Sequence, residues 1–279
     1  MTNKQAKIWF ITGISSGLEK ALAEAVMNHG DFVIGTFRDS RQVDQFNGAN
    51  SEKGAAFKLD INENEQIAQV VSNVTAQFGR VDVLVNNAGY GFAGAVEEAS
   101  ESEIRAAFET NFFGTLSITQ AFLPLFRQQQ SGHIIQISSH SGIKGFAGFG
   151  IYSASKFALE GISEALAAEI APLGIKLTLI EPGPFRTYFA DTSLRQAANR
   201  FDDYEPTAGA FRNRMQQVNG QQEGNPVKAA AAIIQITQTE NPPLRLPLGK
   251  IAISTLTAKL QSVQQDLDNW REVAASAVY

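Results

Sequence analysis

The chain has 279 residues, 44% of them hydrophobic and 18% charged, with a formal net charge of −5 and no cysteine. The negative charge argues against nucleic acid as a partner, and the lack of cysteine excludes disulfides, thiolate metal ligands and a cysteine nucleophile. No apolar run reaches the ~18 residues of a membrane span or resembles a signal peptide, so we expect a cytoplasmic protein without membrane or metal partners.

Short β-branched or aromatic runs alternate with longer helical stretches along the chain. We predict seven strands, at residues 7–12, 31–37, 55–59, 81–86, 133–138, 175–180 and 244–249. Several are almost continuously apolar, as expected for strands covered on both faces. This alternation predicts a single α/β domain over residues 1–279. Its fold would be doubly wound and Rossmann-type, with a seven-stranded, mostly parallel sheet between two layers of helices.

Two helix starts carry a capping signal. Asn62 and Glu65 are placed like an N-cap and its capping-box partner before a helix that ends near Phe78. Ser100 and Glu103 have the same spacing before the next helical stretch.

Residues 182–226 interrupt the alternation because they contain no strand signal. The segment carries six aromatic residues among many charges: Phe185, Tyr188, Phe189, Phe201, Tyr204 and Phe211. A segment of this length in a compact domain is usually a functional loop or a pair of short covering helices, and a disordered insertion is the alternative. We expect it to cover the substrate.

The stretch TGISSGLE, residues 12–19, follows the first predicted strand. Gly13 and Gly17 permit a tight turn in which backbone N–H groups at a helix start meet a phosphate. Glu19 stands where a third glycine is expected, and its carboxylate would oppose bound phosphate. We expect this side chain to point outward, beside Lys20, so that the backbone cradle survives with weakened affinity.

The stretch YSASK places Tyr152 and Lys156 four residues apart, on one face of a helix. A nearby ammonium favours the phenolate and lowers the phenol pKa from ~10, which suits a group that exchanges a proton with a carbonyl or alcohol. Ser138 and Ser139 end the strand before them, where a hydroxyl can bond the reacting oxygen. His140 could reach the same site, although a structural role is favoured, and His29 and His133 are expected to be solvated.

In order, the chain carries TGISSG, LDI (59–61), NNAG (86–89), NFFG (111–114), ISS, YSASK and EPG (181–183). This series resembles the short-chain dehydrogenase/reductase family over roughly residues 7–190. The tail also looks like hydroxysteroid-dehydrogenase-like and carbonyl-reductase-like members.

The resemblance assigns roles to the matching positions. Tyr152 would be the general acid/base, Lys156 would lower its pKa and hold the nicotinamide ribose, Ser139 would bind the substrate oxygen, and Asn111 would hold a water in a proton relay to Lys156. The cofactor would be bound by Gly13, Ser15, Ser16, Gly17, Leu18, Arg38, Asp60, Ile61, Asn87, Ala88, Gly89, Tyr152, Lys156, Pro182, Gly183 and Thr187.

The end of the second predicted strand, GTFRD, indicates which nicotinamide cofactor is used. Phe37 stands where NAD-preferring members usually have an aspartate, and Arg38 could fork onto a 2′-phosphate. Asp39 comes too late in the chain and would cap the next helix. We therefore expect NADP(H), with NAD(H) as the alternative.

These observations predict an NADP(H)-dependent oxidoreductase that interconverts a carbonyl and a secondary alcohol. Apolar walls expected from Tyr90, Phe92, Ile143, Phe146 and Phe149 suggest a fairly apolar small-molecule substrate. The resemblance implies a homodimer or homotetramer. The competing hypothesis is a cofactor-binding regulatory or scaffold protein with little turnover, marked by Glu19.

Overall fold

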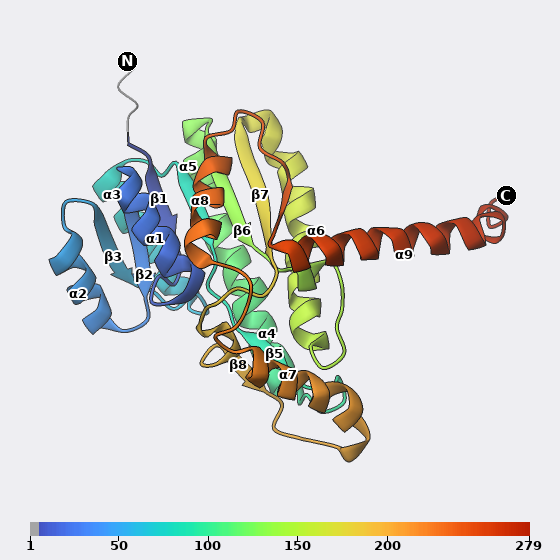
Figure 1. The fold of residues 1–279 in the computed structure, drawn as a ribbon. Coiled ribbons are helices and arrows are strands. Elements are labelled where there is room, and N and C mark those ends of the chain that lie inside the picture. Colours follow the sequence, from blue (N-terminus) through green and yellow to red (C-terminus); the bar gives the residue numbers. More distant parts are fainter. Residues whose placement is uncertain (1–5) are drawn as a thin grey trace.

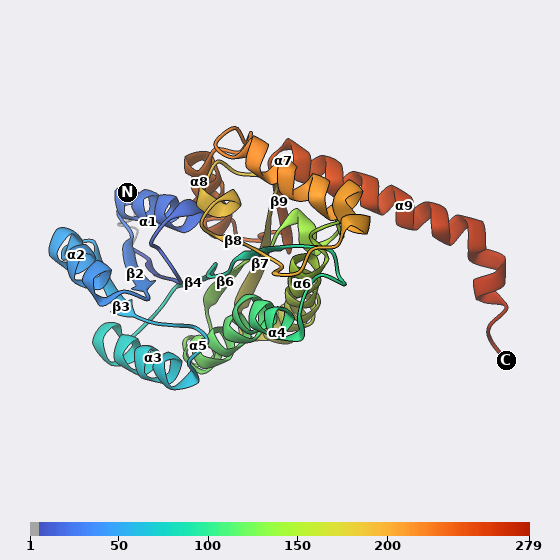
Figure 2. The ribbon, with the colours of Figure 1, turned by 90° about the horizontal axis from the view of Figure 1, so that it is seen from below.

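The computed structural model describes residues 6–279 and contains the predicted sheet. Its strand order is β3-β2-β1-β4-β6-β7-β9, with every pair of neighbours parallel (Figures 1 and 2). All seven predicted strands are present: β1 (Ile8–Ile11), β2 (Phe32–Phe37), β3 (Gly54–Lys58), β4 (Val83–Asn86), β6 (Gly132–Ile137), β7 (Ile175–Pro182) and β9 (Arg245–Leu248).

Helices cover both faces of the sheet (Figure 2). One face packs on α1 (Gly17–His29), α2 (Ser40–Asn50) and α8 (Pro226–Thr237), and the other on α3 (Asn64–Phe78), α5 (Thr115–Gln129) and α6 (Gly150–Ile170). Along β1, Trp9 and Ile11 belong to the first core and Phe10 to the second. Side chains alternate across a strand, so a strand buried on both faces must be apolar at every position.

The two capping predictions have different outcomes. Ser100 and Glu103 form the predicted capping box at the start of α4 (Glu101–Phe108). The capping box of Asn62 and Glu65 is wrong, because α3 begins one residue later than that pattern requires and Glu63 occupies the N-cap without a side-chain bond. The backbone N–H of Asn62 instead donates to the carboxylate of Asp60, which closes the turn before the helix.

The covering segment, residues 182–226, contains more regular structure than the sequence predicted. Its strand β8 (Leu194–Gln196) pairs in parallel with β5 (Gly91–Ala93) and forms a separate two-stranded sheet. Short helical turns lead into α7 (Ala210–Val218). The three-residue strands are too short to give an alternating pattern, and their pairing joins segments about 100 residues apart in the chain.

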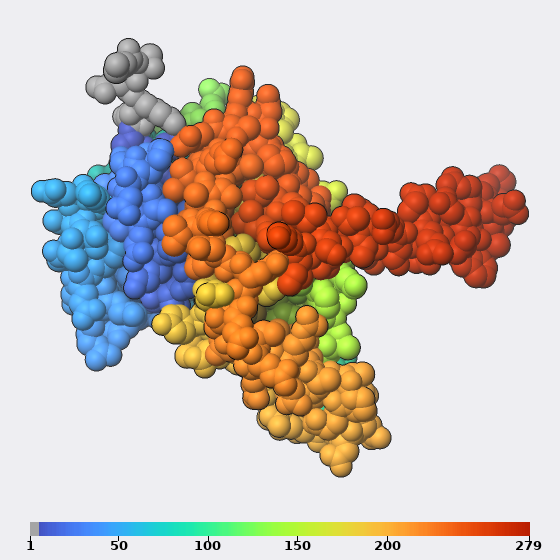
Figure 3. Space-filling view, in the orientation of Figure 1, coloured from blue at the N-terminus to red at the C-terminus, as the bar shows by residue number. Residues whose placement is uncertain are grey.

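The final helix, α9 (Lys250–Ala275), begins against the sheet and then leaves the body of the protein (Figures 1 and 2). Only Ala252 within it is buried. Figure 3 shows its outer part standing clear of the surrounding surface. Within residues 6–279, no helix is both long and apolar enough to cross a bilayer.

Candidate active site

The main cavity opens at the carboxyl ends of the strands, where parallel sheets bind ligands. Its volume is about 700 Å³. The lining comes from the starts of α1, α6 and α9, from the ends of β6 and β7, and from the covering segment. One cavity therefore contains residues from nearly the whole length of the chain.

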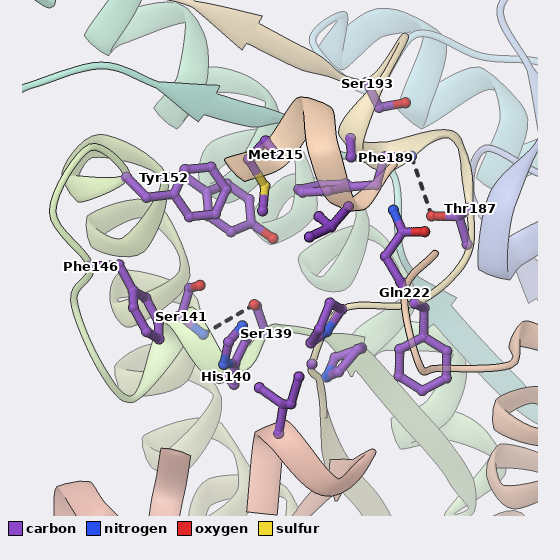
Figure 4. A pocket seen from close by; sticks show the side chains of 18 of the residues that line it. Ser139, His140, Ser141, Phe146, Tyr152, Thr187, Phe189, Ser193, Met215 and Gln222 are labelled. Carbon is purple, nitrogen blue, oxygen red and sulfur yellow. Dashed lines mark hydrogen bonds between the residues drawn. The ribbon is translucent and has the colours of Figure 1, made fainter. Parts of the chain in front are cut away.

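Ser139 and Tyr152 meet in this cavity (Figure 4). Ser139 follows β6, and its hydroxyl accepts a 3.0 Å hydrogen bond from the backbone N–H of Ser141, which fixes its direction. Tyr152 lies in the first turn of α6, and its ring stacks on Phe149 with centroids 4.3 Å apart. Figure 4 shows both hydroxyl groups pointing toward the same part of the cavity.

The titration of Tyr152 differs from the expectation. Burial raises the pKa of its phenol, and the hydrogen bond with Ser139 lowers that pKa by a smaller amount. Lys156 lies one turn away with its Nζ 5.9 Å from the phenol ring centroid, and this Nζ donates a 2.8 Å hydrogen bond to the Ile137 carbonyl. Lys156 therefore does not lower the pKa of Tyr152 as expected. The largest effect on this pKa is the desolvation of the phenolate by burial, which raises it.

Lys156 is itself affected by burial, which lowers its pKa to about 8. The carboxyls of Glu160 and Glu19 oppose that change. An ammonium whose pKa lies this close to neutrality can exchange its proton, as a relay requires.

Asn111 lies behind the cavity in a π-helical turn, Glu109–Gly114, which joins α4 to α5. Its Oδ1 accepts from the Tyr90 N–H at 2.9 Å, and its Nδ2 donates to the Tyr90 carbonyl and the Ser155 hydroxyl. The amide therefore ties the Tyr90 loop to α6. Isolated π turns are frequent at functional sites, since the extra residue redirects a side chain.

The glycine turn has the predicted geometry. Gly13 and Gly17 have φ angles of +73° and +68°, a region that favours glycine. Thr12, which the sequence reasoning missed, joins this turn to the NNAG motif. Its hydroxyl accepts hydrogen bonds from the backbone N–H groups of Asn87 and Ala88 at 3.0 and 3.1 Å.

The expected direction of Glu19 is wrong, because its side chain points into the main cavity. Its carboxyl accepts from the backbone N–H groups of Leu18 and Glu19, bonds to the Asn87 side chain and lies within the electrostatic reach of Lys156. Burial raises its pKa to about 8. The N–H groups of the first helical turn and the nearby ammonium attract the carboxyl inward, whereas Lys20 remains exposed to solvent.

A second hollow lies beside the carboxyl ends of β2 and β3, and Arg38 lines it together with Ser15, Arg41 and Lys58. Asp39 caps α2 as predicted, and its carboxylate pairs with Arg41 at 2.7 Å. The one acidic group lining this hollow is therefore already neutralised by its neighbour.

The other predicted cofactor residues divide into two groups. Those that line the main cavity are Leu18, Asn87, Gly89, Pro182, Gly183 and Thr187. Those outside the lining of both hollows are Gly13, Ser16, Gly17, Asp60, Ile61 and Ala88. Asp60 and Ile61 follow β3, and the Asp60 carboxylate closes its own turn.

The walls of the cavity are largely apolar, as expected. Tyr90, Phe146 and Phe149 line it, but the assignment of Ile143 and Phe92 to the walls is wrong. Ile143 does not line the cavity, and Phe92 is buried with Tyr152 in a third apolar cluster. The covering segment adds Phe185, Phe189 and Phe211.

Gln222 is a buried polar group of the cavity that sequence reasoning missed. Its side chain is 5% exposed, and its Oε1 has no hydrogen-bond partner among the described residues. Figure 4 places it near Thr187. No sequence pattern marks this glutamine, because only the folded covering segment brings it to the site.

His133 and His140, within and after β6, are buried to different degrees. His140 lines the cavity and bonds Thr255 at 3.2 Å, while burial lowers its pKa to about 4. The expectation that His133 is solvated is wrong: it is 5% exposed and bonds Thr178 at 3.0 Å. It points into the protein because it is the second residue of β6, which lies inside the sheet between β4 and β7.

An ion pair attaches α7 to the rest of the site. Arg212 and Glu98 are buried, and Arg212 Nη1 lies 2.7 Å from Glu98 Oε2. Glu98 also accepts from the backbone N–H groups of Ala95 and Phe201. The pair therefore holds the covering segment against the loop that follows β5.

Comparisons with known proteins agree with this geometry. The short chain dehydrogenase family matches residues 7–198. A 3-ketodihydrosphingosine reductase of Bacteroides thetaiotaomicron is 38% identical over 261 residues, 92% of this chain and 93% of that protein. Retinol dehydrogenase 8 of Homo sapiens is 35% identical over 251 residues, 84% and 79% of the two chains. The crystal structure of a short-chain dehydrogenase from Streptomyces avermitilis superimposes with a TM-score of 0.92, at 43% identity and 99% coverage of each chain.

Proposed function

The chain belongs to the short-chain dehydrogenase/reductase family, and on that basis we propose that it is an NADP(H)-dependent oxidoreductase for an elongated, fairly apolar carbonyl or secondary alcohol. The observation that carries the proposal is the meeting of the Ser139 and Tyr152 hydroxyls inside a mostly apolar cavity of about 700 Å³. The polar end of a substrate can contact these hydroxyls while its apolar part lies among the aromatic walls.

The nicotinamide cofactor, when bound, supplies the hydride chemistry. Ser139 would donate a hydrogen bond to the substrate oxygen and hold it beside Tyr152. The Tyr152 hydroxyl would give its proton to a carbonyl oxygen, or take one from an alcohol. Burial raises the pKa of the Tyr152 phenol, so the protonated form of this side chain dominates unless a further charge lies beside it. The protonated phenol favours donation of its proton to a carbonyl oxygen.

Lys156 and Asn111 would support this proton transfer. The Lys156 Nζ would hold the nicotinamide ribose and return a proton to Tyr152, in keeping with its pKa of about 8. Both amide hydrogens of Asn111 are already donated. Its Oδ1 accepts one hydrogen bond and retains a second lone pair, which would hold the relay water.

The residues around the glycine turn fit a dinucleotide. The start of α1 offers backbone N–H groups to a pyrophosphate, and the carboxyl of Glu19 already bonds to two of them. Arg38, Arg41 and Lys58 around the second hollow favour a 2′-phosphate over a bare ribose. NAD(H) remains the alternative cofactor.

The names of two relatives support an apolar substrate. The molecules named in 3-ketodihydrosphingosine reductase and retinol dehydrogenase both have a polar end and a long hydrocarbon part. The chain described here would accept a substrate of that shape. We also propose the homodimer or homotetramer and the cytoplasmic location that the sequence predicted.

A substrate panel tests the proposal. Carbonyls and alcohols with hydrocarbon parts of increasing length are offered with NADPH or NADP⁺, and turnover is followed by the absorbance of NADPH. We expect activity that increases with apolar length. Tight NADPH binding without turnover on any member would favour a regulatory or scaffold protein instead.

A further inference from the structure

The apolar residues of α9 repeat with coiled-coil spacing. Alternating steps of three and four connect Ile253, Leu256, Leu260, Val263, Leu267, Trp270 and Ala274. This 3.5-residue period is the seam with which one helix packs against another. Within this seam, Ile253, Leu260, Val263, Leu267 and Trp270 are 54, 68, 49, 50 and 64% exposed.

Nothing in the described part of the same chain covers this seam. From Leu260 onward every residue of α9 is exposed, and the helix leaves the body of the protein (Figures 1 and 3). A helix in water obtains most of its stability from packing its apolar face, and continuous apolar surfaces of this kind mark interaction sites. At 1.5 Å per residue, a 26-residue helix is about 39 Å long.

We propose that α9 pairs with α9 of a second copy of this chain as an antiparallel, two-stranded coiled coil. In the register that we assign, Leu260 faces Val263 of the partner, Leu256 faces Leu267, and Ile253 faces Trp270. Twofold symmetry repeats each of these layers. Every residue of the seam from Ile253 to Trp270 is then matched by another.

The charges beside the seam favour the antiparallel direction. Lys259 and Asp266 flank the seam and have no ion-pair partner within residues 6–279 of their own chain. Antiparallel pairing brings Lys259 of each copy beside Asp266 of the other. A parallel pair would instead bring Asp266 beside Arg271, which already pairs with Asp268 at 2.9 Å. The antiparallel direction also places the two catalytic bodies at opposite ends, whereas a parallel pair would crowd them at one end.

The same charges make a second helix a better partner than a lipid surface. Amphipathic helices that bind anionic membranes are rich in Lys and Arg on the polar face. Here α9 balances Lys250, Lys259 and Arg271 against Asp266, Asp268 and Glu272. A polar face with balanced charge suits pairing with a copy of itself.

The mass of the full-length protein in solution, measured by light scattering, tests the pairing. Leu260→Asp should halve that mass, and the control Gln265→Asp, on the opposite side of the helix, should leave it unchanged. Lys259→Asp should weaken association, and adding Asp266→Lys to it should restore the original mass. Circular dichroism confirms that each variant is folded. Equal masses for the original protein and Leu260→Asp would overturn the proposal.

Disulfide cross-linking tests the direction in which the two helices pair. Because the chain has no cysteine, an introduced cysteine is its only thiol. Leu256→Cys and Leu267→Cys proteins, mixed and oxidised, should form a mixed disulfide dimer, while neither should cross-link with itself. Efficient self-cross-linking of each variant would overturn the antiparallel assignment in favour of a parallel pair. Cosedimentation of a monomeric protein with phosphatidylglycerol vesicles, abolished by Leu260→Asp, would overturn pairing in favour of a lipid surface.

Discussion

The carboxyl of Glu19, in the first turn of α1, is hydrogen-bonded to the side chain of Asn87 in the loop that follows β4. It also bonds to backbone N–H groups that a helix start offers to an anion. The carboxyl therefore occupies the position that we propose for the cofactor pyrophosphate. Binding would require the side chain to move away or to remain protonated beside the phosphates.

Replacing this carboxyl with an amide should tighten cofactor binding. We expect Glu19→Gln to bind NADPH several-fold more tightly above pH 8, where the Glu19 carboxyl is ionised, and most visibly at low salt. Two charges ~7 Å apart at an effective dielectric constant of ~20 repel by about 2 kcal/mol, and salt screens that repulsion. Calorimetric titration at two salt concentrations measures the effect, with Glu24→Gln, exposed on the same helix, as the control. Unchanged or weaker binding by Glu19→Gln would refute the repulsion.

The raised pKa of Glu19 also predicts how stability depends on pH. The pKa of this carboxyl rises from its ordinary value of 4.5 to about 8 in the folded protein, so the folded state holds the proton more tightly than the unfolded state. The corresponding stabilisation is complete below about pH 4.5 and is lost as pH rises to about 8. Relative to Glu19→Gln, the original protein should lose melting temperature between pH 5 and pH 8. If the melting temperatures of the two proteins changed equally with pH, Glu19 would have an ordinary pKa.

The Tyr152 hydroxyl should be needed for catalysis and not for cofactor binding. We expect Tyr152→Phe to lower turnover by ~10²–10⁴-fold with a nearly unchanged Kd for NADPH, because only proton transfer is removed. Tyr188→Phe is the matched control, since Tyr188 is 63% exposed and lies outside the cavity lining. If Tyr152→Phe kept most of its rate, another group would be the proton donor.

Arg38 should determine the choice of cofactor. Arg38→Ala should weaken NADPH binding by about one to two powers of ten and NADH binding much less, since a hydrogen bond to a charged group contributes roughly 1.5–3 kcal/mol. Arg127→Ala, an exposed arginine at the end of α5, controls for the general loss of positive charge. If Arg38→Ala weakened the binding of NADPH and NADH equally, Arg38 would not be assigned to the 2′-phosphate.

The buried pair of Glu98 and Arg212 should control opening of the covering segment. Glu98→Gln removes the buried carboxylate of the pair and leaves Arg212 with only the half-exposed carboxylate of Glu205. Removing one partner of a buried ion pair typically costs up to about 3–5 kcal/mol. We expect trypsin to cut within residues 185–225 first, and faster in this variant than in Glu101→Gln, which alters an exposed ion pair. Cofactor and substrate together should slow the cutting. Equal cutting with and without ligands would argue against a covering role.

The sequence by itself determined the main sheet and the identity of its chemical groups. Seven strands were predictable because strands covered on both faces must be apolar throughout, as Trp9, Phe10 and Ile11 are. The spacing of Tyr152 and Lys156 placed them on one helical face, and the order of motifs indicated the family. These are local properties, which depend on neighbouring residues along the chain.

Only the tertiary structure decided where several side chains point. Glu19 turns inward because the start of its helix meets Asn87 and Lys156, which come from distant segments. Gln222 enters the cavity, and Thr12 joins two loops, for the same reason. The seam of α9 could have been found from its heptad spacing, but the sequence could not tell that the seam is exposed. Burial depends on contacts between residues far apart in the chain, and a local pattern does not specify those contacts.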